Sequence, residues 1–156
     1  MKKTSGKIVI IGGVAAGPAA AAKAKRLNPD LDITLFEQGE FISYGTCSMP
    51  YYVGNVIPDY GDLISYSPER FEKEKGCKVK TFHRVEEILP HRKKIIVHDL
   101  QNDKHIECLY DQLLIASGAR AKIPNPAWLK AKNVFTIKDL RDSIELKKFI
   151  ESQHPR

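Results

Sequence analysis

Residues 7–17 read KIVIIGGVAAG, an apolar run that ends in a glycine-rich turn. A continuous apolar run such as 7–11 is typical of a strand buried on both faces of a parallel sheet. The Ala-rich stretch that follows, to Leu27, predicts a helix in which Pro18 is tolerated because it lies in the first turn. A second apolar run at 33–36 completes a βαβ unit within about 30 residues.

The glycine turn is suited to binding a pyrophosphate. Gly12 permits the tight turn off the strand, and Gly17 lets the helix pack close to the sheet. The unpaired N–H groups of the helix N-terminus, at Val14, Ala15 and Ala16, can then bind an anion. Val14 stands where the usual G-x-G-x-x-G pattern has its middle glycine, so the motif by itself is imperfect.

Glu37 strengthens this interpretation, because it ends the second strand twenty residues after Gly17. A carboxylate at that position accepts hydrogen bonds from the ribose hydroxyls of an adenosine and repels a 2′-phosphate. The alternative is an ordinary strand–helix turn followed by an exposed Glu. The agreement of strand, turn, helix and carboxylate favours a nucleotide-binding α/β fold.

The remainder of the chain predicts further elements of that fold. Ser67 and Pro68 have the chemistry of a helix start, and the helix should end at Gly76. Short β-like runs follow and predict an antiparallel meander inserted in the α/β framework. These runs are 79–82, 85–89, 94–98 and 106–110. An apolar strand is expected at 113–116, closed by Ser117 and Gly118, and a final amphipathic helix at 139–151.

Composition places the chain among ordinary soluble domains. It has 156 residues, 42% hydrophobic and 28% charged, which excludes intrinsic disorder, collagen and a disulfide-knotted toxin. The net charge of +6 comes from cations scattered along the chain. This favours a solvated surface over a nucleic-acid footprint, and it would also suit a small phosphorylated ligand.

Three cysteines without zinc-like spacing indicate a reducing compartment and no metal site, and His105 with Cys108 is not expected to bind an ion. The apolar run 8–22 imitates a signal peptide, but glycines and lysines interrupt it and it is too short to cross a bilayer. We therefore expect a cytoplasmic protein that binds neither membrane nor nucleic acid.

The segment 41–54, FISYGTCSMPYYVG, contains the cysteine of greatest interest, Cys47. A short helix should begin near Thr46, and its N-terminus would stabilise a thiolate. No second cysteine is near enough for an internal CxxC-type disulfide, so a redox-active Cys47 must form a mixed disulfide or a sulfenic acid. The alternative is a buried structural cysteine, which is the interpretation favoured for Cys77 and Cys108.

Three stretches together resemble the FAD-binding domain of the single-cysteine pyridine nucleotide–disulfide oxidoreductases: GGVAAGPAAAAKAKR (12–26), FEQGEFISYGTCSMPYYVG (36–54) and YDQLLIASGAR (110–120). Within that family, the chain looks most like the coenzyme A-disulfide reductases and their persulfide- and polysulfide-reducing relatives. The resemblance covers essentially the whole chain. It implies a Rossmann-like domain with a parallel sheet and an inserted meander.

The same resemblance implies site residues. The glycine turn would bind the FAD pyrophosphate, Glu37 would bind the adenosine ribose, and Cys47 would face the flavin and form a mixed disulfide with coenzyme A (CoA). The stretch Ala116, Ser117 and Gly118 would cross back over the cofactor.

Further positions match residues that contact CoA in the family: Arg26, Ser43 and Lys75. Two cations and a hydroxyl suit its phosphates and pantetheine. Two positions depart from relatives. Thr46 stands where many members have Asn before the cysteine, and Ala15 replaces a His carried by NADH oxidases and peroxidases, which disfavours oxygen or peroxide as substrate.

Residues 1–156 are therefore expected to form the FAD-binding, N-terminal part of a longer homodimeric reductase that takes electrons from NADH or NADPH. CoA disulfide or a CoA persulfide would be its substrate. The NADH-binding and dimerisation domains would lie beyond Arg156. The alternatives are a non-catalytic FAD or adenine-nucleotide module and an NADH oxidase-type flavoprotein.

Overall fold

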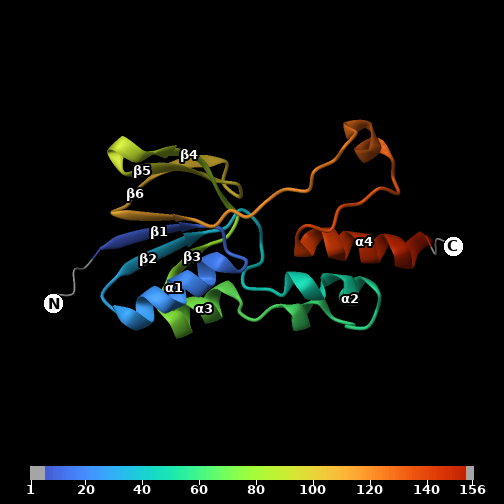
Figure 1. Ribbon diagram of the computed structural model, residues 1–156, viewed down its shortest axis with the longest axis horizontal. Coiled ribbons are helices and arrows are strands. Elements are labelled where there is room, and N and C mark those ends of the chain that lie inside the picture. The colour runs from blue at the N-terminus through green and yellow to red at the C-terminus, as the bar shows by residue number, and fades with distance from the viewer. Residues whose placement is uncertain (1–5, 154–156) are drawn as a thin grey trace. The chain divides into compact units, whose positions relative to one another are not determined.

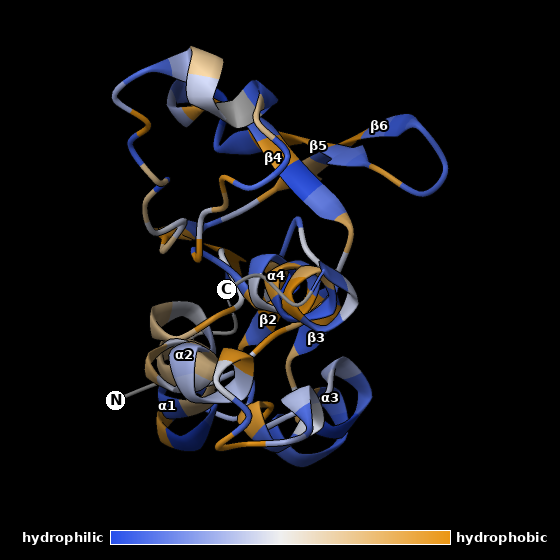
Figure 2. Ribbon diagram, turned by 90° about the vertical axis from the view of Figure 1, so that its right-hand side faces the viewer, coloured by the Kyte–Doolittle hydropathy of each residue, from blue (hydrophilic) through white to orange (hydrophobic). Residues whose placement is uncertain are grey.

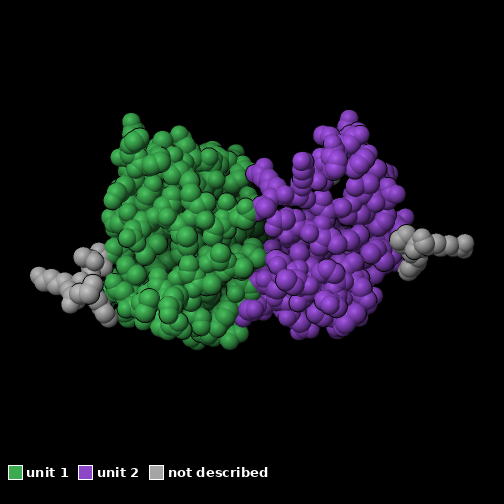
Figure 3. Space-filling view, in the orientation of Figure 1, with its two compact units in different colours: residues 1–43, 66–118 green, residues 44–65, 119–156 purple. Residues whose placement is uncertain are grey.

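A computed structural model describes residues 6–153, with the exception of the side chain of Leu129. The chain forms two compact units, each made from two separate segments (Figure 3). Unit 1 comprises residues 1–43 and 66–118, and unit 2 comprises residues 44–65 and 119–156.

A four-stranded parallel sheet organises unit 1, with the strand order β3-β2-β1-β7. Its strands are β1 (Lys7–Ile11), β2 (Asp32–Phe36), β3 (Lys78–Lys80) and β7 (Gln112–Ile115). The helix α1 (Ala16–Leu27) connects β1 to β2, as the sequence predicts, and Pro18 lies in its first turn. The strands at 7–11, 33–36 and 113–116 are thus confirmed, with ends that differ by at most one residue.

Both faces of this sheet are covered, which explains the continuous apolar strands (Figure 1). Ile10 and Leu35 pack on one face against Ala21 of α1 and Phe71 of α3 (Pro68–Lys75). Val9 and Phe36 belong to a second cluster, on the opposite face, since successive side chains of a strand alternate. Its other buried members come from the segment 94–110, and the buried residues of the cluster are Val9, Phe36, Ile95, Val97 and Tyr110.

The antiparallel meander consists of β4 (His83–Leu89), β5 (Lys94–Asp99) and β6 (Lys104–Leu109). The prediction that it begins near residue 79 is wrong. Residues 78–80 instead form β3, which pairs in parallel with β2 through Leu35 and Val79, and residues 81 and 82 form a turn. Local sequence cannot distinguish these partners, because the same apolar spacing suits a parallel edge strand and a hairpin.

The chemistry predicted for the ends of α3 is confirmed. The hydroxyl of Ser67 accepts a hydrogen bond from the Arg70 N–H at 3.2 Å, and Pro68 occupies the first turn. Gly76 ends the helix with φ +68°, a left-handed conformation that glycine adopts without strain.

Unit 2 is built from short helices and one longer helix: η1 (Thr46–Ser48), α2 (Met49–Val53), η2 (Tyr60–Leu63), η4 (Pro126–Lys130) and α4 (Leu140–Gln153). The helix α4 packs against α2 and runs two residues beyond the predicted end at 151. Figure 2 shows hydrophobic and hydrophilic residues together around α4. Its buried Lys147 donates a hydrogen bond to the Pro58 carbonyl at 3.0 Å and lies over the Tyr52 ring, 4.1 Å from its centroid.

Among the described residues, no helix combines the length and the apolar character needed to cross a membrane.

Candidate cofactor and substrate site

The three segments predicted to bind a cofactor meet at the carboxyl ends of the parallel strands. The Gly12 N–H donates to the Phe36 carbonyl at 2.8 Å, and the Ala116 N–H donates to the Ile11 carbonyl at 2.8 Å. Gly12, Glu37 and Ala116 therefore follow β1, β2 and β7 at one edge of the sheet. Ligands of open parallel sheets bind at this edge, where the connections of neighbouring strands diverge.

Close backbone packing explains the glycines of the turn. Gly12 has φ +107°, and a Cβ there would overlap the carbonyl oxygen of Ala116. A Cβ on Gly17 would overlap the Gly12 carbonyl oxygen, so the helix α1 starts as close to the turn as the backbone permits. A Cβ on Gly13 would lie 2.8 Å from Ile42 and 2.9 Å from the Glu37 side chain. The turn is thus a compact cradle that larger residues would fill.

Glu37 is half-buried and its carboxylate organises the loop around it. Its Oε2 accepts a hydrogen bond from the Gly13 N–H at 2.7 Å, and its Oε1 accepts one from the Gly39 N–H at 2.8 Å. A carboxylate can accept about four hydrogen bonds, so acceptor sites remain for the two hydroxyls of a ribose. The contact with Gly13 is an additional role that the sequence does not reveal.

The N-terminus of α1 has no side-chain cap and no acidic residue in its first turn. Ala15 and Ala16 are exposed and Val14 is half-buried, so small side chains surround the N–H groups at this helix end. A helix N-terminus carries partial positive charge, and this one leaves room for a phosphate at the backbone. The residues present therefore fit the pyrophosphate of a dinucleotide.

The residues after β7 begin at the same edge. Ser117 and Gly118 are exposed, and Gly118 has φ +69° with open space around it. A left-handed turn at this point lets the backbone change direction directly after the strand. The predicted closure of the strand by Ser117 and Gly118 agrees with the structure.

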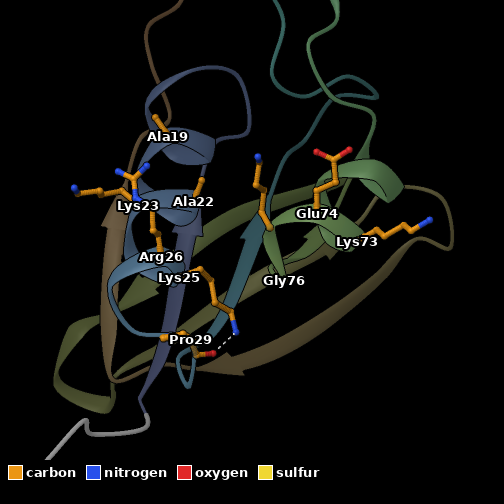
Figure 4. Close-up of a pocket in the computed structure, with 10 residues that line it drawn as sticks. Ala19, Ala22, Lys23, Lys25, Arg26, Pro29, Lys73, Glu74 and Gly76 are labelled. Carbon is orange, nitrogen blue, oxygen red and sulfur yellow. Dashed lines mark hydrogen bonds between the residues drawn. The ribbon is translucent and has the colours of Figure 1, made fainter.

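A basic hollow of about 690 Å³ lies between α1 and α3 (Figure 4). It brings together Arg26 and Lys75, two of the residues matched to CoA contacts, and Lys75 also lies 4.7 Å over the Tyr66 ring. Three further cations line it that the sequence reasoning did not select: Lys23, Lys25 and Lys73. Lys23 and Arg26 are three residues apart on α1, a spacing that could have indicated a shared helix face. Glu74 is the acidic residue of the lining.

Ser43, the third matched residue, does not line this hollow. Its N–H donates to the Gly13 carbonyl at 2.9 Å, and its φ of +49° is unusual for a residue other than glycine. Ser43 therefore belongs to the region of the glycine turn.

Cys47 and Thr46 lie in unit 2, and both are exposed. The predicted short helix is present as η1, a single 3₁₀ turn that continues into α2. Its Ser48 N–H donates to the Gly45 carbonyl at 3.1 Å. Because η1 is a single short turn, its helix dipole is small. The expected reactivity of Cys47 therefore depends on the exposure of its thiol as well as on the helix end.

The other two cysteines differ from Cys47 in burial. Cys77 is buried beside β3, and burial raises the pKa of its thiol. Cys108 is partly buried and packs on the cluster around Val97. All three cysteines have free thiols. The structural interpretation of Cys77 and Cys108 agrees with these positions.

Comparison with known proteins shows the family. The family model of pyridine nucleotide-disulphide oxidoreductases matches residues 6–153. The chain belongs to this family. Among the relatives of this oxidoreductase is a coenzyme A disulfide reductase of Staphylococcus haemolyticus, which is 32% identical over 148 residues. The aligned residues cover 95% of this chain and 33% of the relative.

Solved structures of the family support the fold. The crystal structure of reduced Bacillus anthracis CoADR-RHD superposes with a TM-score of 0.95 at 32% identity, over 98% of this chain and 28% of that one. An NAD-dependent persulfide reductase from A. fulgidus gives a TM-score of 0.87 at 34% identity, over 94% of this chain and 27% of that one. The chain spans about a third of the length of the curated relatives it matches.

Proposed function

We propose that this chain is the FAD-binding part of an NAD(P)H-dependent disulfide reductase that acts on CoA disulfide or CoA persulfide through Cys47. The observation that carries the proposal is the meeting of Gly12, Glu37 and Ala116 at the carboxyl edge of the parallel sheet. The similarity to proteins named coenzyme A disulfide reductase and persulfide reductase supports the substrate class.

The residues at the sheet edge would hold the flavin nucleotide. The N–H groups of Val14 to Gly17 would bind its pyrophosphate, and the free acceptor sites of Glu37 would bind its ribose hydroxyls. Residues Ala116, Ser117 and Gly118 would lie along the same cofactor. Bound FAD would supply the two-electron chemistry between a nicotinamide and a disulfide.

Cys47 would be the residue that contacts the substrate sulfur. Its thiolate attacks CoA–S–S–CoA, which forms the Cys47–S–S–CoA mixed disulfide and releases one CoA thiolate. Two electrons from NAD(P)H then return Cys47 and the second CoA to thiolates, so one reduced nicotinamide is consumed for each disulfide. With a CoA persulfide, the released group is sulfide. A single cysteine suffices because CoA provides the second sulfur.

The basic hollow would bind the phosphates of CoA. Arg26 and Lys75 lie in its lining, and a guanidinium paired with an ammonium suits a phosphorylated ligand. Ser43 and Thr46 would contact the substrate through their hydroxyls. The intact reductase would be a cytoplasmic homodimer with an NADH-binding domain and a dimerisation domain.

A mixed-disulfide assay tests the substrate class without a flavin. The chain is incubated with CoA disulfide, and the adduct is located by mass spectrometry of peptides. We expect CoA on Cys47 and not on Cys77 or Cys108, and faster labelling than with cystamine, a small disulfide that lacks phosphates. Equal labelling of all three thiols, or no preference for CoA disulfide, would contradict the proposal.

A flavin titration tests the alternative of an adenine-nucleotide module that binds no flavin. We expect the chain to quench FAD fluorescence saturably, and a protein that leaves FAD fluorescence unchanged would not be a flavin domain. A non-catalytic FAD module would bind FAD and leave Cys47 inert towards CoA disulfide.

A further inference from the structure

One titratable side chain from each strand of the meander meets on a single face. They are Glu86 on β4, His98 on β5 and His105 on β6, and we call them the Glu–His–His cluster. Each offers one ligand atom, and these atoms all lie within 4.8 Å of one another. Figure 2 shows hydrophilic stretches along these strands.

Strand pairing explains how residues far apart in sequence come together. His98 pairs across β5 and β6 with His105, and their rings stack with centroids 4.4 Å apart. On the other side, His98 pairs with Arg84 of β4. The register of β4 shifts between Val85 and Glu87, so Glu86 is the extra residue of a β-bulge. Bulges change the direction of a side chain, and this one turns Glu86 towards the two imidazoles.

The two oxygens of Glu86 each lie near one ring nitrogen. Oε1 is 3.4 Å from Nδ1 of His98, and Oε2 is 2.9 Å from Nε2 of His105. Bonds of about 2.0–2.1 Å in tetrahedral geometry separate neighbouring ligand atoms by about 3.3 Å. The two contacts with Glu86 are close to this value, and all three ligand atoms lie within 4.8 Å, so the side chains must move closer together when an ion binds.

Asp103 supplies a second observation. Its Oδ1 lies 2.8 Å from Nε2 of His98, the nitrogen that does not face Glu86. A carboxylate on the far nitrogen of an imidazole selects the tautomer whose other nitrogen is free to bind a metal, and this outer contact is usual at metal sites.

We propose that Glu86, His98 and His105 bind one divalent transition-metal ion of the Zn²⁺ type, with Asp103 orienting His98. Two imidazoles and one carboxylate suit Zn²⁺, Ni²⁺ or Cu²⁺, whereas Mg²⁺ and Ca²⁺ prefer oxygen ligands alone. The ion would link all three strands of the meander. The sequence gives no sign of this site, because its ligands have no close spacing along the chain.

The guanidinium of Arg84 would compete with a metal ion for Glu86 and His98. Its guanidinium donates to Oε1 of Glu86 at 2.6 Å and lies 3.4 Å from Nδ1 of His98. Its side chain is 46% exposed, so it can move into solvent when an ion binds. The stacked rings must also tilt, because a ring nitrogen binds a metal in the plane of its ring. His105 is 55% exposed and free to do so.

Calorimetric titration with Zn²⁺ tests the site. The chain is first alkylated at its accessible thiols, so that Cys47 cannot bind zinc. We expect one Zn²⁺ per chain, a rise in the melting temperature because the ion binds the folded state, and no binding of Mg²⁺. Glu86→Gln and His105→Asn should abolish binding, and Arg84→Met should tighten it by removing the competing cation.

Two further variants distinguish binding at the Glu–His–His cluster from nonspecific binding of zinc to exposed side chains. Asp103→Asn keeps a residue that tolerates the φ of +51° found there, and it should weaken binding on the order of 10- to 100-fold. His91→Asn removes an exposed imidazole outside the cluster and should leave binding unchanged. Zn²⁺ that fails to bind saturably, or that binds His105→Asn as well as the original chain, overturns the proposal.

Discussion

The carboxylate of Glu37 is hydrogen-bonded to the backbone N–H of Gly13 at 2.7 Å, although the two residues are 24 positions apart. This contact ties the end of β2 to the turn after β1. It also holds the acceptor of the ribose hydroxyls next to the turn that would bind the pyrophosphate. Glu37 therefore contributes to the shape of the cradle as well as to its chemistry.

Glu37→Ala should lower the affinity for FAD and also the stability of the chain without flavin. The loss of a charged hydrogen-bond acceptor costs about 1–3 kcal/mol, and here two backbone donors lose their partner as well. Calorimetric FAD titration and thermal melting measure the two effects. Gln38→Ala, at the exposed neighbouring position, is the control. Unchanged flavin affinity would refute the assignment of Glu37.

Gly12→Ala should destabilise the fold much more than Gly118→Ala. Both glycines have positive φ, so either change costs about 1–2 kcal/mol of backbone strain. Only at Gly12 would the new Cβ also overlap a backbone atom, the carbonyl oxygen of Ala116, whereas Gly118 has open space. Urea denaturation of both variants measures the difference. Equal losses would mean that packing at the sheet edge is looser than the structure indicates.

Cys77 should make the stability of the chain fall at alkaline pH. Burial raises the pKa of its thiol above that of the unfolded chain, which is about 8.5. The stabilisation is complete below the unfolded pKa and is lost as the pH rises through the folded pKa, because the unfolded state releases its proton first. Denaturation at pH 7.5 and 9.5 measures this loss, and Cys77→Ala should reduce it.

The burial of Cys77 also predicts an order of alkylation. Iodoacetamide near neutral pH should modify the exposed Cys47 first and Cys77 last, with Cys108 between them. Peptide mass spectrometry at increasing times gives the three rates. Modification of Cys77 before Cys47 would contradict the proposed role of Cys47.

Arg26→Ala and Lys75→Ala should each weaken the binding of adenosine 3′,5′-bisphosphate, the nucleotide end of CoA. A lost charge-assisted hydrogen bond to phosphate corresponds to about tenfold in affinity. Lys104→Ala removes the same charge from β6 and serves as the control for net charge. If all three variants bind equally well, the basic hollow is a solvated surface.

Lys147→Met should destabilise the chain, whereas Lys148→Met should not. The methionine keeps the apolar stem of Lys147 but removes the hydrogen bond to Pro58 and the cation over Tyr52, a loss of about 1–3 kcal/mol. Lys148 is exposed and next to it in sequence. Thermal melting compares the two, and equal melting temperatures would show that the buried ammonium is not needed.

The sequence alone determined the βαβ core and the chemistry of its edge. Apolar runs, the spacing of the glycines and of Glu37, and the signals around α3 are patterns that can be read along the local sequence, so they are sufficient to predict these elements. The lone Cys47 and its helical turn could be recognised for the same reason.

Only the tertiary structure decided which distant segments pair. Residues 78–80 joined the parallel sheet and not the meander, since the choice depends on which edge the folded chain offers and not on local spacing. The contact of Glu37 with Gly13, the burial of Lys147 and the Glu–His–His cluster likewise require residues brought together from as far as 24, 89 and 19 positions apart, respectively. Such contacts form only when the core closes, because the free energy that supports them comes from burial of the whole fold.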